Sequence, residues 1–312
     1  MESVLLVLPD FAIILLGLWL SRRTSYPRAF WDGAESIVFN WMLPPLLFMS
    51  VSQSHFTLGD SAHFLAVGIG SMMTGVVAAW LVRYLVKADN VTHASVFQCG
   101  FRFNTYIGFA LCSRFLGDEG LSLMSLLIAL WVPISNSIAV AVLASAVAME
   151  KGDGHPDRTK LVLTTVKAVF KNPLILATLA GLAVNILGIH VPRAGADFLR
   201  HLGNASLAMG LLSIGAGLRL GELRGHMGLI LAASVERLVV VPLFASLFIY
   251  LFGLTGTAAG VVLIFAALPT AQSCYVMTAG MGGNAPMVAA VTTAQTLLSM
   301  VTLSVLVLLC FA

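Results

Sequence analysis

The sequence is dominated by apolar stretches that are long enough to cross a lipid bilayer. Crossing about 30 Å of hydrocarbon takes roughly 20 helical residues, and about ten such stretches can be counted. They lie near residues 4–20, 37–52, 64–86, 95–116, 121–148, 173–189, 198–218, 227–252, 258–280 and 286–311. Only 10% of the residues are charged, against roughly 25% in an ordinary soluble domain. A helix satisfies its own backbone hydrogen bonds in lipid, so we expect an all-α polytopic membrane protein with ten transmembrane helices.

Two of these stretches are interrupted by polar residues. The ninth holds FAALPTAQSCYVMTAGMGG from Phe265 to Gly283, where Pro269 removes a backbone donor and clashes with the preceding helical turn. The fourth holds CGFRFNTYIGFALC from Cys99 to Cys112, an interruption at a similar depth. In hydrocarbon, such breaks are tolerated where they are buried in protein or line a wet cavity. Two interrupted spans in corresponding places therefore indicate the binding site of a transporter.

The basic residues predict how the chain is oriented. When loops are assigned alternately to the two sides, one side collects most of the Lys and Arg residues, and the other holds Arg114, Arg193 and Arg200. Cytoplasmic loops carry the excess of positive charge, so both termini are expected on the periplasmic or extracellular side. Five spans then lie on each side of a polar connector, residues 150–171. This predicts two five-helix repeats of opposite orientation, residues 1–149 and 172–312.

The connector has a pattern of its own. From Arg158, lysines alternate with Leu, Val and Phe residues, in the sequence RTKLVLTTVKAVFKNP. This pattern suits a basic amphipathic helix on the cytoplasmic leaflet, with membrane lipid as its partner. A cytoplasmic extension of the sixth span is the alternative.

Together these segments resemble the auxin efflux carrier family. The resemblance is carried by ALPTAQSCYVMTAGMGGNA from Ala267, by RFNTYIGFAL from Arg102, and by the ten-span layout with a central cytoplasmic loop. That family includes plant auxin exporters and bacterial transporters of malonate, malate and related organic anions. The resemblance covers nearly the whole chain. It implies two inverted repeats, a scaffold part and a transport part, and broken helices four and nine that cross at the substrate site.

The residues of the two breaks favour an anion as substrate. A half-helix N-terminus carries roughly half a positive charge and unsatisfied amides, which bind anionic oxygens. Arg102 adds a full charge, although snorkelling or structural pairing would also explain it. For the other polar side chains, helix-to-helix hydrogen bonding or simple packing is the alternative. The candidate substrate-binding residues are Arg102, Asn104, Thr105, Tyr106, Asn136, Pro269, Thr270, Gln272, Ser273 and Tyr275.

Three further ionisable residues are candidates for ion coupling: Asp10, Glu236 and Arg237. Ionisable side chains within membrane spans usually mark function. Glu236 and Arg237 are adjacent and so about 100° apart on a helix, which means that they need not face each other. An ion pair for Glu236 and a hydrated position for Asp10 are the structural alternatives. By the family resemblance, Arg237 is a structural cation near the crossing.

The seven histidines and four cysteines show no metal-ligand spacing. We therefore expect inert thiols, no metal and no cofactor. H⁺ or Na⁺ would be the coupling ion if transport is coupled.

These features favour a secondary transporter of a small organic anion, a mono- or dicarboxylate such as malonate or malate, in the bacterial inner membrane. The resemblance implies an elevator-like alternating-access mechanism. The chain has no HExxH and no GxxxxGK[ST] motif, so neither an enzyme nor an ATP-driven motor is expected. An anion channel or a ligand-binding membrane sensor with the same fold is the alternative. No nucleic-acid partner is expected, and small-residue pairs such as Gly181 and Asn185 permit a homodimer without locating its interface.

Overall fold

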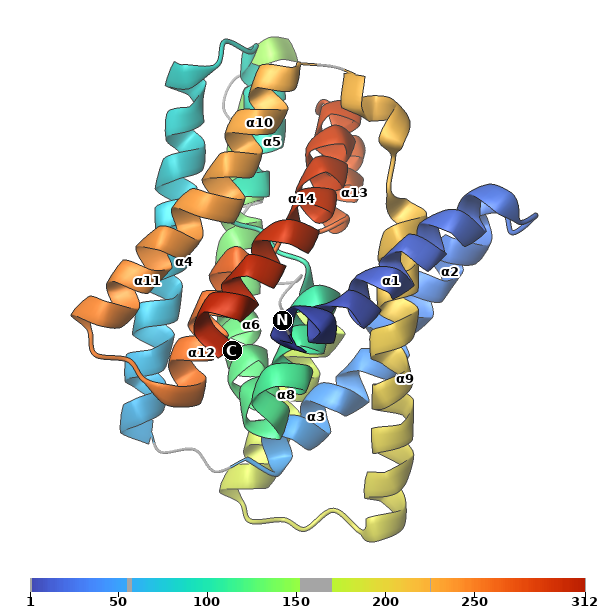
Figure 1. The fold of residues 1–312 in the computed structure, drawn as a ribbon, viewed down its shortest axis with the longest axis vertical. Coiled ribbons are helices and arrows are strands. Elements are labelled where there is room, and N and C mark those ends of the chain that lie inside the picture. The colour runs from blue at the N-terminus through green and yellow to red at the C-terminus, as the bar shows by residue number, and fades with distance from the viewer. Residues whose placement is uncertain (1, 55–57, 152–169, 225, 312) are drawn as a thin grey trace.

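The computed structural model describes residues 2–54, 58–151, 170–224 and 226–311, and every regular element in these ranges is a helix (Figure 1). This confirms the all-helical prediction for the described chain. Most of the polar connector, including the predicted amphipathic helix, lies outside the described residues.

The helices follow one another with short connections. In chain order they are α1 (Glu2–Arg23), α2 (Arg28–Ile37), η1 (Val38–Met42), α3 (Leu43–Ser52), α4 (Leu58–Leu85), α5 (Asn90–Phe97), η2 (Gln98–Gly100), α6 (Thr105–Lys151), α8 (Pro173–Ile186), α9 (Arg193–Gly217), η3 (Leu220–Arg224), α10 (Met227–Val235), η4 (Glu236–Val240), α11 (Val241–Leu251), α12 (Gly256–Ala267), α13 (Ser273–Gly280) and α14 (Ala285–Phe311). Elements η1 and η4 are wider π-helical turns inside continuous helices, whereas η2 and η3 are 3₁₀ turns. The long helix α6 bends at Gly117, whose φ of 61° is left-handed, and this bend lies where the sequence predicts the boundary between spans four and five.

Five helical stretches of the described chain are long and apolar enough to cross a membrane, judged by length and composition. They are Arg28–Ser52, Ala62–Leu85, Asn90–Glu150, Met227–Leu251 and Ala285–Cys310. Two shorter apolar helices, Pro173–Ile186 and Gly256–Ala267, accompany them. The protein is therefore a multi-pass membrane protein, and its arrangement as ten spans in two inverted repeats stays a prediction.

Both predicted helix breaks are present. In the predicted fourth span, the helix ends at Gly100, the last residue of η2, and α6 begins at Thr105. In span nine, α12 ends at Ala267 and α13 begins at Ser273. Leu268 is extended, with φ −63° and ψ 140°, because the proline ring that follows disfavours the helical conformation at this position. The first break contains no proline, so another feature must end and restart its helix.

The helices pack in two groups. In the first group, α1 lies along α9, and α3 packs against α8 and α9. In the second, α11 packs against α4, α12 against α6, and α13 against α14. Figure 1 shows α9, α1 and α2 on the right and α4, α10 and α11 on the left, with α14 and α6 between them. Each group takes helices from both halves of the chain, so the halves are interleaved in space.

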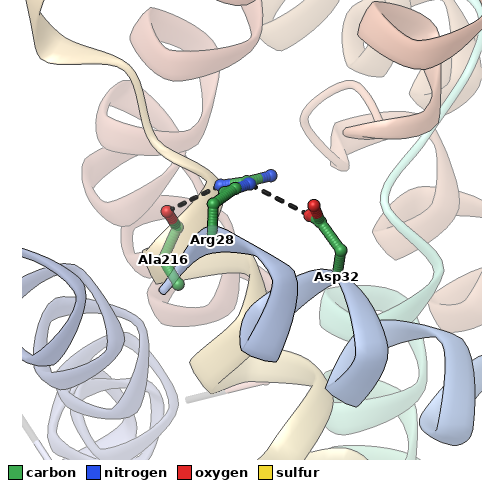
Figure 2. A network of polar contacts seen from close by, with 3 residues as sticks. All are labelled: Arg28, Asp32 and Ala216. Carbon is green, nitrogen blue, oxygen red and sulfur yellow. Dashed lines mark hydrogen bonds and ion pairs between the residues drawn. The ribbon is translucent and has the colours of Figure 1, made fainter. Parts of the chain in front are cut away.

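An arginine ties α2 to the end of α9 within the first group. Figure 2 shows Arg28 between Asp32, 3.0 Å away, and the carbonyl oxygen of Ala216, to which it donates at 3.1 Å. Ala216 lies in the last turn of α9, where carbonyls lack intrahelical partners and the helix dipole favours a cation. The exposed pair with Asp32 contributes little, so the contact to the helix end is the structural part of this network.

Two glycines allow α1 and α9 to pack with their backbones in contact. A methyl group on Gly215 would overlap the carbonyl oxygen of Ile14, and one on Gly17 would overlap that of Leu212. Close approach through small residues is the usual way in which membrane helices associate.

We expect Gly215→Ala to lower the free energy of unfolding by about 1–3 kcal/mol, the usual cost of overpacking. The matched control is Gly33→Ala in α2, because nothing lies within 4 Å of a methyl group there. Alanine is the better helix former by about 1 kcal/mol, so this control is expected to raise stability. Thermal unfolding in detergent, followed by circular dichroism, measures both. A stabilising Gly215→Ala would contradict the close packing of α1 and α9.

Candidate functional site

After the first break, the side chain of Asn104 starts the next helix, α6. Its Oδ1 atom accepts hydrogen bonds from the backbone N–H groups of Tyr106, at 3.1 Å, and Ile107, at 3.3 Å. Asparagine is among the preferred helix N-caps because its oxygen satisfies amides that the first turn leaves free. The local sequence therefore starts α6 without a proline.

The two breaks are hydrogen-bonded to each other. The backbone N–H of Asn104 donates to the carbonyl oxygen of Pro269 at 2.8 Å. In return, the Thr270 hydroxyl donates to the carbonyl oxygen of Arg102 at 3.2 Å. The predicted residues Arg102, Asn104, Pro269 and Thr270 thus come together, and all four are buried.

Two side chains from neighbouring helices complete this backbone network. The indole of Trp131 in α6 donates to the carbonyl oxygen of Phe101 at 2.9 Å. The amide of Gln295 in α14 accepts from the N–H of Thr270 at 3.0 Å and donates to the carbonyl of Ala233 in α10 at 3.1 Å. The groups freed by the breaks are in this way satisfied inside the protein, as hydrocarbon requires.

Arg102 is a buried cation held by neutral partners. It is 8% exposed and donates to Oε1 of Gln98 at 2.6 Å and to the Ser273 hydroxyl at 2.9 Å, with the Met277 sulfur at 3.5 Å. Gln98 is itself held by Thr278, to whose hydroxyl its amide donates at 2.9 Å.

No carboxylate of the described residues forms an ion pair with this arginine. The ion pairs recorded among the described residues join Arg28 to Asp32 and Arg114 to Asp10. A buried charge without a counter-charge is costly, so the guanidinium of Arg102 is suited to an anionic ligand.

Tyr106 and Gln272 face the glycine-rich side of α9. The ring of Tyr106 fills the space beside Gly210, and the amide of Gln272 lies beside Gly217, 3.1 Å from where a methyl group would be. The Tyr106 hydroxyl and the Gln272 Nε2 atom are buried without a hydrogen-bond partner in the described chain. These glycines are seven residues apart, about two helical turns, and so share one face of α9. This face is where the first group of helices meets both breaks.

The remaining predicted site residues are less closely tied to the crossing. Thr105 is half-buried at the start of α6, and Ser273 is exposed at the start of α13, where it accepts from Arg102. Tyr275 in α13 stacks beneath the guanidinium of Arg219, 4.0 Å from the ring centre. Asn136 is half-buried on α6, and no recorded hydrogen bond joins it to the described residues of either break.

Glu236 and Arg237 sit in the π-helical turn η4, and each faces a different break. Arg237 is fully buried and donates to the carbonyl of Phe265, in the last turn of α12, at 3.2 Å. The Glu236 carboxylate lies beside Gly100. Among the described residues no ion pair joins Glu236 to Arg237, as expected for neighbours in sequence that need not face each other.

Asp10, the third coupling candidate, joins two helices. Its Oδ1 atom pairs with Arg114 of α6 at 2.7 Å, and it is 7% exposed. Asp10 is therefore buried and ion-paired, and is not in the hydrated position considered from the sequence. The pair links α1 of the first group to α6 of the second.

Sequence reasoning missed Gln98, Trp131 and Gln295. Gln98 and Gln295 are completely buried amides in apolar helices, and a buried amide must find partners. The sequence shows both amides in apolar stretches, but it does not show which groups Gln98 and Gln295 bind. Nothing in the sequence singled out Trp131.

A cavity of about 650 Å³ lies between the two groups of helices, at the ends of α3, α9 and the bend of α6. Its lining is partly apolar and partly polar, and the polar part is mixed in charge, with Ser50, Gln53, Asp118, Glu119, Arg200 and Asn204 among its members. No group of three His, Cys, Asp or Glu side chains able to hold a metal ion occurs among the described residues. The four cysteines are free, and the Cys274 sulfur lies 3.6 Å from the hydroxyl of Thr270.

The sequence matches the family described as "Membrane transport protein" over residues 3–307. It is 24% identical over 278 residues to the "Putative malonate transporter" of Rhizobium meliloti (strain 1021), covering 87% of this chain and 84% of that protein. It is 22% identical over 194 residues to the "Uncharacterized transporter YfdV" of Escherichia coli (strain K12), covering 60% of each chain. Since the family match takes in both breaks and nearly all of the helices around them, this chain belongs to the auxin efflux carrier family of membrane transport proteins.

Proposed function

We propose that this protein is a secondary transporter of a small organic anion, a mono- or dicarboxylate, which binds where the two broken helices cross. The observation that carries this proposal is Arg102, a cation 8% exposed whose recorded partners are all neutral. A carboxylate would supply the missing counter-charge through charge-assisted hydrogen bonds. The helix α13 begins at Ser273, beside Arg102, so its N-terminal dipole adds to the positive potential there.

The relatives support a carboxylate as substrate. The Rhizobium meliloti protein is named for malonate, and its match covers 87% of this chain. Malonate is a short dicarboxylate, and one of its carboxylates could pair with Arg102 while the other accepts from neighbouring donors. The Tyr106 hydroxyl and the Gln272 Nε2 atom, which are buried without a partner in the described chain, and the half-buried Thr105 at the start of α6 are predicted site residues that could offer such donors.

The arrangement of the helices supports alternating access. The two groups meet along the glycine face of α9, at the Asp10–Arg114 pair and around the 650 Å³ cavity. In an elevator-like mechanism, α4 to α6 and α10 to α14 would carry the crossing past α1 to α3, α8 and α9. We further propose ten spans in two inverted repeats, a location in the bacterial inner membrane, and both termini outside the cytoplasm, since basic residues gather in the opposite loops.

The charge of Arg102 is tested by Arg102→Gln in proteoliposomes. We expect the half-saturating concentration of malonate to rise about tenfold or more, since a lost charge-assisted hydrogen bond is worth roughly 1.5–3 kcal/mol. Uptake of a neutral analogue, the diamide of malonate, should change far less. Arg23→Gln, which removes an exposed arginine in the last turn of α1, is the matched control and should behave as wild type. Equal effects on the anion and its neutral analogue would assign Arg102 a structural role.

The role of Asn104 is separated into capping and transport by two substitutions. Asn104→Ala should cost about 1 kcal/mol of stability, the usual value of an N-cap, and should abolish uptake because the start of α6 loses its geometry. Asn104→Ser can still cap with its hydroxyl and should keep the stability and recover uptake in part. Thermal unfolding and radiolabelled malonate uptake measure the two effects. Wild-type uptake by Asn104→Ala would remove Asn104 from the site.

A carrier and a channel differ in their fluxes. We expect saturable malonate uptake and counterflow, in which unlabelled malonate inside the vesicles accelerates entry of labelled malonate. Alternating access requires this exchange, whereas a pore does not produce it. Currents that follow the voltage without saturating would identify a channel, and binding of malonate without any flux would identify a sensor.

A further inference from the structure

A small cavity behind the first break is lined by two titratable side chains that have unpaired polar atoms. Glu236 of η4 is 5% exposed, and both its carboxylate oxygens are without a hydrogen-bond partner in the described chain. His93 of α5 is 8% exposed, and its Nε2 atom is likewise unpartnered. The two side chains line the same cavity.

The carboxylate of Glu236 lies against the end of the broken helix. A methyl group on Gly100 would be 2.5 Å from its Oε2 atom, so Gly100 leaves the space that the carboxylate occupies. Gly100 is the last residue of η2, two positions before Arg102. The charge state of Glu236 therefore changes the electrostatic potential at the proposed anion site.

The surroundings stabilise an ionised carboxylate only weakly, because the adjacent Arg237 favours its charge but no donor in the described chain bonds to its oxygens. The neighbouring Arg237 directs its guanidinium to the carbonyl of Phe265, and Arg83 of α4 lies over the ring of Trp80 at 4.7 Å. The other side chains that α4, α5 and α10 contribute to the lining are apolar: Ala79, Val82, Val96, Phe97, Leu229 and Ala233. A buried anion without a hydrogen-bond donor is costly, so a carboxylate in such a place favours binding a proton.

The size of the cavity selects the ligand. It holds about 10 Å³, which is about the space of one water molecule. A metal cation would need several further oxygen ligands, and Glu236 offers the only side-chain oxygens among the described lining residues. A proton needs only one oxygen or nitrogen atom to bind to, so it fits this cavity.

His93 provides a route for that proton. Its ring lies edge-on to that of Trp80, 6.1 Å between the ring centres, and its Nε2 atom has no hydrogen-bond partner in the described chain. The bare Nε2 can accept a proton or a hydrogen bond. His93 lies about two turns nearer the start of α5 than Gly100 does, so it stands between that end of the helix and the carboxylate.

We propose that Glu236 and His93 form a proton-binding site behind the first break, and that the proton bound there is the ion coupled to transport. The coupling part rests on the proposed function. A proton from water on one side bonds to a Glu236 oxygen, by way of His93, and is released to water on the other side after the helices have moved. The π-helical turn that holds Glu236 is a feature frequently found at functional sites.

The charges at the crossing explain why the proton and the anion would travel together. With Glu236 ionised, its negative charge offsets one of the two positive charges of Arg102 and Arg237. With Glu236 protonated, both positive charges act on the substrate. Protonation therefore strengthens anion binding, and by linkage the bound anion strengthens proton binding to the same extent.

Infrared spectroscopy tests proton binding without any substrate. In lipid nanodiscs titrated from about pH 5 to about pH 8, the range in which histidine also changes charge, the wild type should show a protonated carboxyl band that declines as pH rises. Glu236→Gln should remove this band, and His93→Asn should shift its midpoint. Asp10→Asn, which changes a buried carboxylate paired with Arg114, is the matched control and should retain it. The infrared bands of wild-type protein with ¹³C-labelled glutamate show directly whether Glu236 is ionised. A Glu236 that is ionised throughout this pH range would overturn the proposed proton site.

Transport tests the coupling, with radiolabelled malonate in proteoliposomes. A pH gradient should concentrate malonate in wild-type vesicles, and Glu236→Gln should keep malonate exchange at equal pH but lose this concentration. Proton coupling would be overturned if a pH gradient made Glu236→Gln vesicles concentrate malonate as wild type does. It would also be overturned if a Na⁺ gradient alone made wild-type vesicles concentrate malonate. A wild type that moves no malonate would count against the proposed function, and the infrared titration would still decide the proton site.

Discussion

The structure depends on a reciprocal pair of hydrogen bonds between two interrupted helices. The N–H of Asn104 donates to the carbonyl of Pro269, and the hydroxyl of Thr270 donates to the carbonyl of Arg102. Free peptide groups in hydrocarbon cost several kcal/mol each, so neither break is stable unless the other lies beside it. Trp131 and Gln295 satisfy further backbone groups around this pair. The crossing is therefore a single unit made from two parts of the chain that are more than 150 residues apart, by the numbering of the residues that bond.

The buried charges are arranged around this unit. Arg237 binds the C-terminal end of α12, where the helix dipole favours a cation. Arg102 lies at the other side with neutral partners, and Glu236 faces the end of η2. A membrane protein retains such costly groups where they serve function. In our proposals, a carboxylate substrate and a proton supply the charges that the resting protein lacks.

The packing of the helices offers a plane along which the crossing could move. Within each group the contacts are extensive, whereas α9 meets the breaks through glycines at Gly210 and Gly217. These glycines leave room for the ring of Tyr106 and the amide of Gln272, and they have no side chains of their own that interlock with them. The Asp10–Arg114 ion pair crosses the same boundary. An ion pair can break and form again, which suits an interface that moves in each transport cycle of the proposed mechanism.

The sequence by itself determined the membrane class, the helical fold and the places of both breaks. Apolar length, Pro269 and the polar run after Arg102 are local properties, and local properties decide where a helix can form in lipid. Only the tertiary structure decided which groups complete the site. Asn104 proved to be a helix cap, Gln98 and Gln295 proved to hold Arg102 and Thr270, and Glu236 proved to share a cavity with His93. These partners lie on different helices, and their distance in space follows from the packing of whole helices, which no local pattern records.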